Sequence, residues 1–194
     1  MYNRFLAAAL LAATITGCQS EEWQTKDISG VMPDLAFSLT GEQGTPVTEK
    51  AFAGNATLLF FGFTSCPDVC PTTLARLSTV LDKLPEEERR QVRVLFVSVD
   101  PERDDPEHLR KYTEYYGPEF VGLTGTQDEL RALTKRYRVT YSYAEPDENG
   151  DYAVSHSSAV FGFAPDGRIR VLMRDDDGTE AILADLRRLV NERG

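Results

Sequence analysis

The chain has 194 residues, 41% of them hydrophobic, with ten Phe, eight Tyr and one Trp. This length and apolar content predict a single folded domain and exclude a disordered chain. The formal net charge is −10, and no cluster of basic residues outweighs its acidic neighbours. We therefore expect no binding to nucleic acid.

The N-terminus has the pattern of an export signal. Arg4 precedes an apolar run of eleven residues, 5–15, which is too short to span a bilayer as a helix. Small residues before Cys18 resemble a bacterial lipobox, so we expect 1–17 to be a lipoprotein signal peptide and Cys18 to carry lipid. Such a protein is exported and anchored to a bacterial membrane, with its domain facing the periplasm or the cell exterior. Secretion after ordinary cleavage nearby is the alternative, and Gln19 leaves the choice of membrane open.

A polar tether, 18–30, leads into the first predicted strand. Alternation over 31–39 places Leu35, Phe37 and Leu39 on one face, and Val47 and Thr48 supply a partner strand, which together predict an N-terminal hairpin.

The next segments predict a strand–helix–strand unit. A continuous apolar run at 58–63 is typical of a central strand covered on both faces. Leucines at helical spacing predict a helix over 72–84, and 92–99 is a second central strand that ends at Asp100.

The remaining predicted elements are a charged turn at 85–90, a helix around Leu109, Tyr112 and Tyr116, a short strand at 120–123, a helix capped by Thr126 and Glu129, an acidic turn at 145–151, a hairpin of 157–163 with 169–173, and a C-terminal helix over 181–193. This order of elements predicts a thioredoxin-like α/β fold over 31–194, with a mixed central sheet flanked by helices and an N-terminal hairpin extension.

Cys66 and Cys70 lie four positions apart, where the first central strand gives way to a helix. This spacing puts both sulfurs on one side of the backbone, within reach of one ligand. Pro67 and Pro71 stiffen the loop, and the helix N-terminus favours the thiolate of either cysteine. Thiolates bind soft metals and attack disulfides, whereas a structural disulfide is the alternative that needs no further function.

Two histidines and one aspartate are further candidates. His108 reads as an exposed helix residue, whereas His156 begins a core strand that approaches the cysteine loop in a thioredoxin-like fold. Asp100 ends the second central strand, where it either supports the site or faces a partner, or else caps the turn at Pro101.

Four ordered motifs resemble the signature of the Sco/SenC family. They are Phe61-Gly62-Phe63-Thr64-Ser65-Cys66-Pro67-Asp68-Val69-Cys70-Pro71-Thr72-Thr73-Leu74, Val97-Ser98-Val99-Asp100-Pro101-Glu102-Arg103-Asp104, Gly122-Leu123-Thr124-Gly125 and His156-Ser157-Ser158-Ala159-Val160-Phe161. Ser65 stands where many members carry histidine, and the segment between Tyr141 and Tyr152 is idiosyncratic.

The resemblance implies a membrane-tethered copper protein with a thioredoxin fold, which assists assembly of the CuA centre of cytochrome c oxidase. Carried over by position, Cys66, Cys70 and His156 bind the copper. Two thiolates and an imidazole suit Cu(I) and, with a further weak ligand, Cu(II), although Zn(II) accepts the same ligands.

The partners implied are subunit II of the oxidase, with its CuA domain, and other copper chaperones or thiol reductants. Two other functions stay open. One is a thiol-disulfide oxidoreductase that reduces the cysteines of the CuA site, in which Cys66 and Cys70 are catalytic. The other is a copper- or redox-sensing lipoprotein. The three-residue spacing between the cysteines departs from the CxxC of redox sites, and disulfide exchange does not need His156, so both features favour metal binding.

Overall fold

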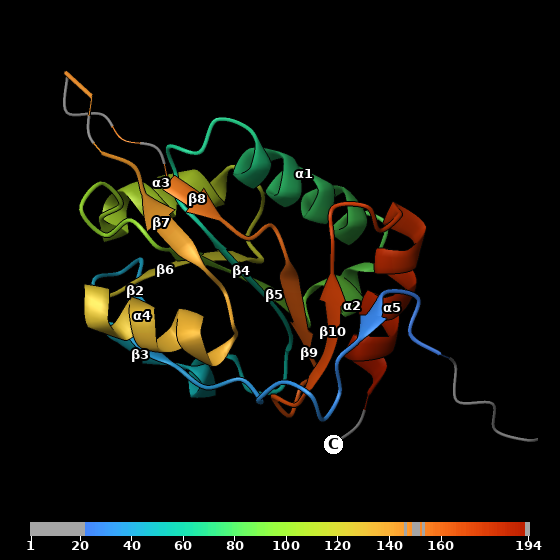
Figure 1. Cartoon of the computed structure of the whole chain (residues 1–194). Helices are drawn as coiled ribbons and strands as arrows, with labels where there is room; N and C mark the ends of the chain where they lie inside the picture. The colour runs from blue at the N-terminus through green and yellow to red at the C-terminus, as the bar shows by residue number, and fades with distance from the viewer. Residues whose placement is uncertain (1–21, 146, 149–151, 153, 193–194) are drawn as a thin grey trace, which may run out of the picture.

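Eight strands form one mixed sheet at the centre of the molecule. The structure is a computed structural model that describes residues 22–145, 147–148, 152 and 154–192. In the sheet the strands follow the order β1-β10-β9-β4-β5-β6-β2-β3. Their bounds are β1 Lys26–Asp27, β2 Ser38–Gly41, β3 Pro46–Thr48, β4 Ala56–Gly62, β5 Val92–Ser98, β6 Phe120–Thr124, β9 Val160–Phe163 and β10 Ile169–Met173. Figure 1 shows this sheet between its covering helices.

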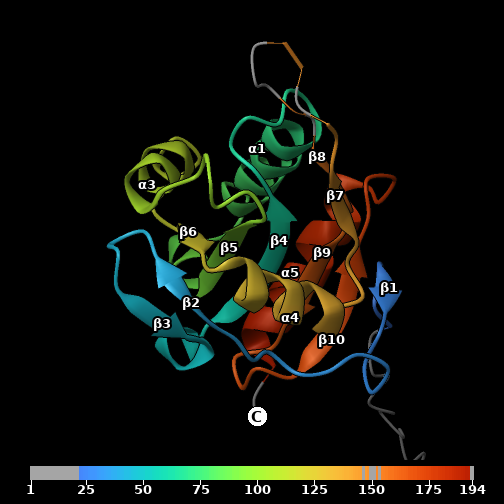
Figure 2. The ribbon, with the colours of Figure 1, turned by 60° about the vertical axis from the view of Figure 1, so that its left-hand side comes forward.

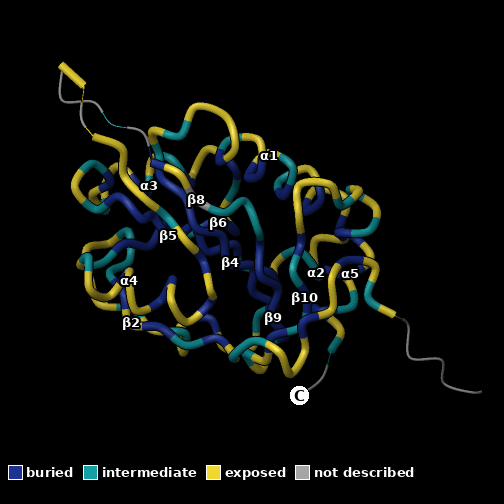
Figure 3. Tube along the Cα trace, viewed as in Figure 1, coloured by how far each residue is buried: buried dark blue, intermediate teal, exposed yellow. Residues whose placement is uncertain are grey.

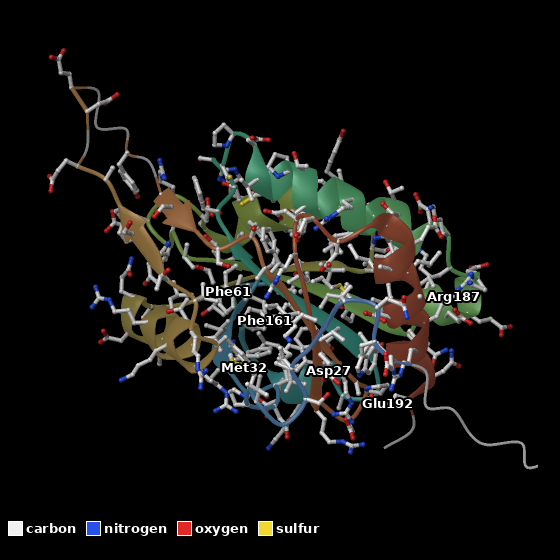
Figure 4. All side chains as sticks on the ribbon, turned by 45° about the vertical axis from the view of Figure 1, so that its right-hand side comes forward. Asp27, Met32, Phe61, Phe161, Arg187 and Glu192 are labelled. Atoms are coloured by element: carbon white, nitrogen blue, oxygen red, sulfur yellow. The ribbon has the colours of Figure 1, made fainter. Side chains whose placement is uncertain are left out.

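Helices cover both faces of the sheet. They are α1 Val69–Leu81, α2 Glu86–Arg89, α3 Pro106–Glu114, α4 Gln127–Arg136 and α5 Thr179–Asn191, with a short 3-10 helix at Glu49–Phe52. Successive residues of β4 point to opposite faces, so Phe60 packs in the core under α1, α3 and α5, whereas Phe61 packs under α4. Phe61 meets Phe161 of β9 edge to face in that second core, at a centroid distance of 6.4 Å (Figure 4). Figure 3 shows the central strands as the most buried part of the chain.

The parallel strands β4, β5 and β6 end at the same edge of the sheet. The cysteine loop, defined here as residues 64–70, follows β4, and Asp100 follows β5. Because ligands bind at the carboxyl ends of the strands in such sheets, this edge is where a site is expected.

A second, two-stranded sheet lies outside the main one. It pairs β7 (Tyr141–Tyr143) with β8 (Val154–His156). We call this strand pair, together with Tyr152 that precedes β8, the arm. In Figures 1 and 2 the arm lies at the same end of the molecule as the cysteine loop.

The thioredoxin-like arrangement, its mixed sheet and its N-terminal hairpin are confirmed, but several predicted boundaries are wrong. The strand predicted over 31–39 begins only at Ser38 and continues to Gly41 as β2, because the amides of Ala36 and Phe37 donate to the side chains of Tyr137 and Glu49 instead of to a strand. Leu35, Phe37 and Leu39 are nevertheless buried, as the alternation predicts.

Other boundaries move by a few residues. The predicted turn at 85–90 contains the helix α2, the strand predicted from 157 begins at Val160, and the C-terminal helix ends at Asn191. The strands β1, β7 and β8 have only two or three residues each, too few for a periodic pattern, and they were not predicted.

A buried carboxylate holds the first described residues to the domain. Asp185 of α5 is 1% exposed and accepts hydrogen bonds from the Gln24 amide (2.8 Å), the Thr25 amide (2.7 Å) and the Thr25 hydroxyl (2.7 Å). Beside it, the Arg188 guanidinium stacks 3.8 Å over the Trp23 ring. These contacts fix where the described chain enters the fold. In the part of the chain that is described, no helix combines the length and apolarity needed to cross a bilayer.

Replacing Asp185 with alanine should lower the free energy of unfolding by about 2–3 kcal/mol, because two buried donors of Thr25 and the partly buried Gln24 amide lose their acceptor. Chemical denaturation measures the difference, and the exposed Asp176→Ala is the control, expected to change stability by less than about 0.5 kcal/mol. Equal stabilities for the two variants would show that Asp185 does not hold the segment.

Candidate metal centre

Helix α1 begins inside the cysteine loop. It was predicted from residue 72, but it starts at Val69 and ends at Leu81, so Cys70 belongs to its first turn. Pro71 is tolerated there because amides of the first turn have no partner within the helix. The Cys66 amide donates to the Phe63 carbonyl at 3.2 Å, and the Cys70 amide donates to the Cys66 sulfur at 3.4 Å. The short loop thus folds Cys66 back over the start of the helix.

The two cysteines differ in exposure. No disulfide joins them. Cys70 is fully buried, whereas Cys66 is partly buried and packs against the cores on both faces of the sheet. Cys66 therefore offers the approachable sulfur, with Cys70 beneath it.

The expectation that the helix N-terminus favours both thiolates is wrong for Cys70. Burial raises the pKa of this thiol far above its ordinary value, and the nearby Cys66 sulfur and Asp104 carboxylate raise it further. Desolvation outweighs the helix dipole here, because Cys70 lies in an apolar core. A cation that binds this sulfur must displace its proton.

Gly62, the last residue of β4, makes room for Cys70. A Cβ atom at this position would lie 2.6 Å from the Cys70 sulfur and 2.6 Å from Cε2 of Phe96. Because both neighbours are in a closely packed core, neither can move away cheaply. The missing side chain is what lets the sulfur lie against the end of the strand.

Gly62→Ala should therefore destabilise the protein by about 1–3 kcal/mol and displace the Cys70 sulfur. Denaturation measures the first effect, and the rate of Cys70 alkylation in the folded protein measures the second, with an increase expected. Unchanged stability together with an unchanged alkylation rate would contradict the close approach.

Asp104 fastens the cysteine loop to the second central strand, a role that the sequence analysis did not assign. It is fully buried and accepts from the Thr64 amide (2.9 Å), the Thr64 hydroxyl (2.5 Å) and the Ser98 hydroxyl (2.5 Å). Asp104 is forty positions from Thr64 along the chain, so no local sequence pattern predicts this contact. The sequence indicated a role for Asp104 only through its place at the end of the motif that runs from Val97 to Asp104.

Asp100 lies beneath the arm. It is 1% exposed, and its carboxylate accepts from Nε of Arg103 at 2.5 Å and from the Tyr152 hydroxyl at 2.7 Å. It is therefore more than a solvent-facing cap before Pro101. Burial, followed by the Asp100 carboxylate, raises the pKa of Tyr152 to about 12, so the hydroxyl keeps its proton as a donor at neutral pH.

The two histidines lie on different elements. The expectation that His156 begins a core strand is wrong: its backbone ends β8, opposite Tyr141, and the core strand β9 begins only at Val160. The imidazole of His156 lies outside the described side chains. His108 is on α3 and exposed, as predicted, with its ring 3.5 Å from the Thr64 hydroxyl and 3.3 Å from the Arg103 carbonyl. Cys18, the predicted lipidation site, also lies outside the described residues.

The described residues fit a soft metal ion at this edge of the sheet. They provide two sulfurs, one from the loop before α1 and one from its first turn, and the buried Tyr112 hydroxyl nearby has no hydrogen-bond partner among them. Burial raises the pKa of Tyr112, with smaller contributions from Tyr116 and from both sulfurs. Among the described side chains no three His, Cys, Asp or Glu residues are grouped to hold a metal. Two elements bring a histidine to this end of the molecule: α3 carries His108, and β8 ends at His156.

Comparison with known proteins gives the family. Residues 29–191 match the family described as SCO1/SenC. The chain is 41% identical over 130 residues to the mitochondrial SCO1 homolog 1 of Arabidopsis thaliana, covering 67% of this chain but 39% of that protein. It is 38% identical over 160 residues to a putative copper-binding protein of Stutzerimonas stutzeri, covering 81% of this chain and 77% of the relative.

A solved structure extends the likeness to three dimensions. Copper-bound ScoI of Bradyrhizobium japonicum superposes with a TM-score of 0.72 at 36% sequence identity, covering 80% of this chain and 98% of that one. The family match extends over most of the residues that the structure describes, including the cysteine loop and the arm. The chain therefore belongs to the SCO1/SenC family.

Proposed function

We propose that this protein is a copper metallochaperone that binds Cu(I) and Cu(II) as cargo and assists assembly of the CuA centre of cytochrome c oxidase. The observation that carries the proposal is the pair of sulfurs at the carboxyl end of β4, with the Cys70 amide 3.4 Å from the Cys66 sulfur. Family membership supports it, as does the similarity to a copper-bound ScoI.

The proposed ligands are Cys66, Cys70 and His156. Thiolates select Cu(I), and an imidazole extends the set toward Cu(II). Cys66 is the partly exposed ligand from which exchange to a partner would begin, and Cys70 is the buried one that retains the ion. Binding requires both thiols to lose their protons, so the affinity for copper depends on pH.

The proposed partner is the CuA domain of oxidase subunit II, reached from a membrane. In this proposal 1–17 is the lipoprotein signal peptide, Cys18 carries the anchor, 18–30 is the tether and 31–194 is the functional domain. The second half of the tether packs on that domain, because β1 pairs with β10. Strand β1, where the described chain enters the fold, lies beside β10, away from the arm and the cysteine loop (Figure 1). An anchor attached at that side would leave the sulfurs facing away from the membrane.

A thiol-disulfide reductase is the second candidate, because a partly exposed Cys66 lies above a buried Cys70. In such a reaction the Cys66 thiolate attacks a partner disulfide, and the Cys70 thiolate then releases the partner as a dithiol, leaving a Cys66–Cys70 disulfide. The raised pKa of Cys70 disfavours the second step, since only the thiolate attacks. Metal binding must displace the same proton, so it is the three-residue spacing of the cysteines and the presence of His156, rather than this pKa, that favour metal binding.

Copper titration of the reduced protein tests the proposal. We expect one tightly bound copper per monomer, with thiolate-to-Cu(II) charge-transfer absorption that His156→Ala weakens strongly. The matched control is His108→Ala, which removes the other of the two histidines from an exposed helix position and should change neither affinity nor spectrum. Wild-type binding by His156→Ala would remove His156 from the site, and efficient reduction of an oxidised CuA domain by that variant would support the reductase instead.

A further inference from the structure

Among the described strands, those of the arm form no backbone hydrogen bonds with the main sheet. Strands β7 and β8 pair only with each other among the described strands. A two-stranded hairpin by itself is marginally stable in water. The position of the arm must therefore come from side-chain contacts with the body of the protein.

Two tyrosines of the arm reach the end of β5. The Tyr143 hydroxyl donates to the Val99 carbonyl, and the Tyr152 hydroxyl donates to Asp100 at 2.7 Å. The two tyrosine rings meet edge to face at 5.7 Å. The hydrogen bond of Tyr152 is the stronger of the two, because its acceptor is the buried Asp100 carboxylate and not a neutral carbonyl.

Arg103 completes a three-residue cluster with Asp100 and Tyr152. Its guanidinium lies 3.8 Å from the centre of the Tyr152 ring, and its Nη1 donates to the Tyr152 carbonyl at 3.2 Å. Its Nε donates to Asp100 at 2.5 Å. Both the ring and the backbone of Tyr152 are thus held, which fixes the chain just before β8 begins.

The same guanidinium faces the start of the cysteine loop, because it lies 5.8 Å from the centre of the Phe63 ring. Phe63 accepts the hydrogen bond from the Cys66 amide through its carbonyl. The cluster therefore contacts two segments that are far apart in the sequence. One leads into Cys66, and the other leads, four residues later, to His156.

We infer that Asp100, Arg103 and Tyr152 form a clamp that positions β8, and with it His156, against the cysteine loop. Tyr152 and Arg103 are positioning residues that bind no copper themselves. The inference rests on the proposed function, since it assumes that His156 is a ligand. A ligand held in place before the ion arrives binds more tightly, because less ordering has to occur on binding.

The first test uses the full-length, copper-free protein. Tyr152→Phe keeps the ring over Arg103 but removes the hydroxyl that donates to Asp100, so amide hydrogen exchange in β8 should become about tenfold faster. The matched control is Tyr141→Phe, which removes the same atom from the same arm, where its partner is Gln127 at 3.4 Å. Equal exchange in β8 for the two variants would overturn the clamp.

The second test measures copper affinity in a double-mutant cycle. Tyr152→Ala should weaken binding by about 10- to 100-fold, the usual cost of losing a group that orients a ligand. In the His156→Ala background the same substitution should change affinity by less than about twofold, because no ligand is left to position. Global unfolding of each variant is measured alongside.

The outcomes separate this inference from the proposed function. A large loss in His156→Ala without a loss in Tyr152→Ala would overturn the clamp and leave the proposed ligands intact. Equal losses from Tyr152→Ala in both backgrounds would also overturn it, because a general structural defect does not depend on His156. Wild-type affinity in His156→Ala would overturn the proposed ligand set and the inference with it.

Discussion

Replacing Asp104 with alanine should lower the free energy of unfolding by about 2–4 kcal/mol. The carboxylate is fully buried and accepts hydrogen bonds from Thr64, twice, and from Ser98. Without it, the buried Ser98 hydroxyl and the two partly buried donors of Thr64 lose their acceptor, and each such loss is costly. Chemical denaturation measures the change.

The neighbouring Asp105→Ala is the control. Asp105 is exposed and caps α3 by accepting from the His108 amide at 2.8 Å, so its loss should cost about 1 kcal/mol. Asp104→Ala should also speed amide exchange at Thr64, which Asp105→Ala should not. Similar stabilities for the two variants would show that the hydrogen bonds of Asp104 do not hold the cysteine loop in place.

Cys70→Ser should remove tight copper binding. A hydroxyl is a hard, weak ligand for Cu(I), so the loss should exceed the roughly 10- to 100-fold that follows removal of an outer-shell partner. Competition against a Cu(I) chelator measures it. Because serine is close in size to cysteine, the fold should be retained, and retention of full affinity would exclude Cys70 from the site.

Cys70→Ser also tests how the affinity for copper depends on pH. Burial raises the pKa of Cys70, so the thiol is protonated at neutral pH and copper must displace that proton. Wild-type affinity should therefore rise with pH, by about tenfold per pH unit for each proton released. A plot of the logarithm of the copper affinity against pH should have a slope smaller by about one in Cys70→Ser, because one proton fewer is released on binding. An identical slope would show that Cys70 does not release a proton on binding.

The sequence predicted the elements that have a strong local signal. Thr126 and Glu129 form the predicted capping box at the start of α4, where the Thr126 amide donates to Glu129 at 2.8 Å. The apolar runs 58–63 and 92–99 became the buried parallel strands β4 and β5. In these cases one segment carries all the information that the structure uses.

The features around the site were harder to predict because they depend on distant contacts. Nothing local indicates that Asp104 meets Thr64 or that Asp100 meets Tyr152, 52 positions away. The thiolate expectation for Cys70 was wrong because its burial is a property of the assembled core. The proximity of the two cysteines could be predicted, since their spacing and their place after a central strand are local, and the Cys70 amide does lie 3.4 Å from the Cys66 sulfur.

X-ray absorption at the copper edge tests the central claim most directly. With one equivalent of Cu(I), the protein should show two sulfur neighbours and one imidazole nitrogen, and His156→Ala should lose the nitrogen while keeping both sulfurs. His108→Ala should match the wild type. A copper environment without nitrogen in the wild type, or an unchanged one in His156→Ala, would contradict a centre built from Cys66, Cys70 and His156.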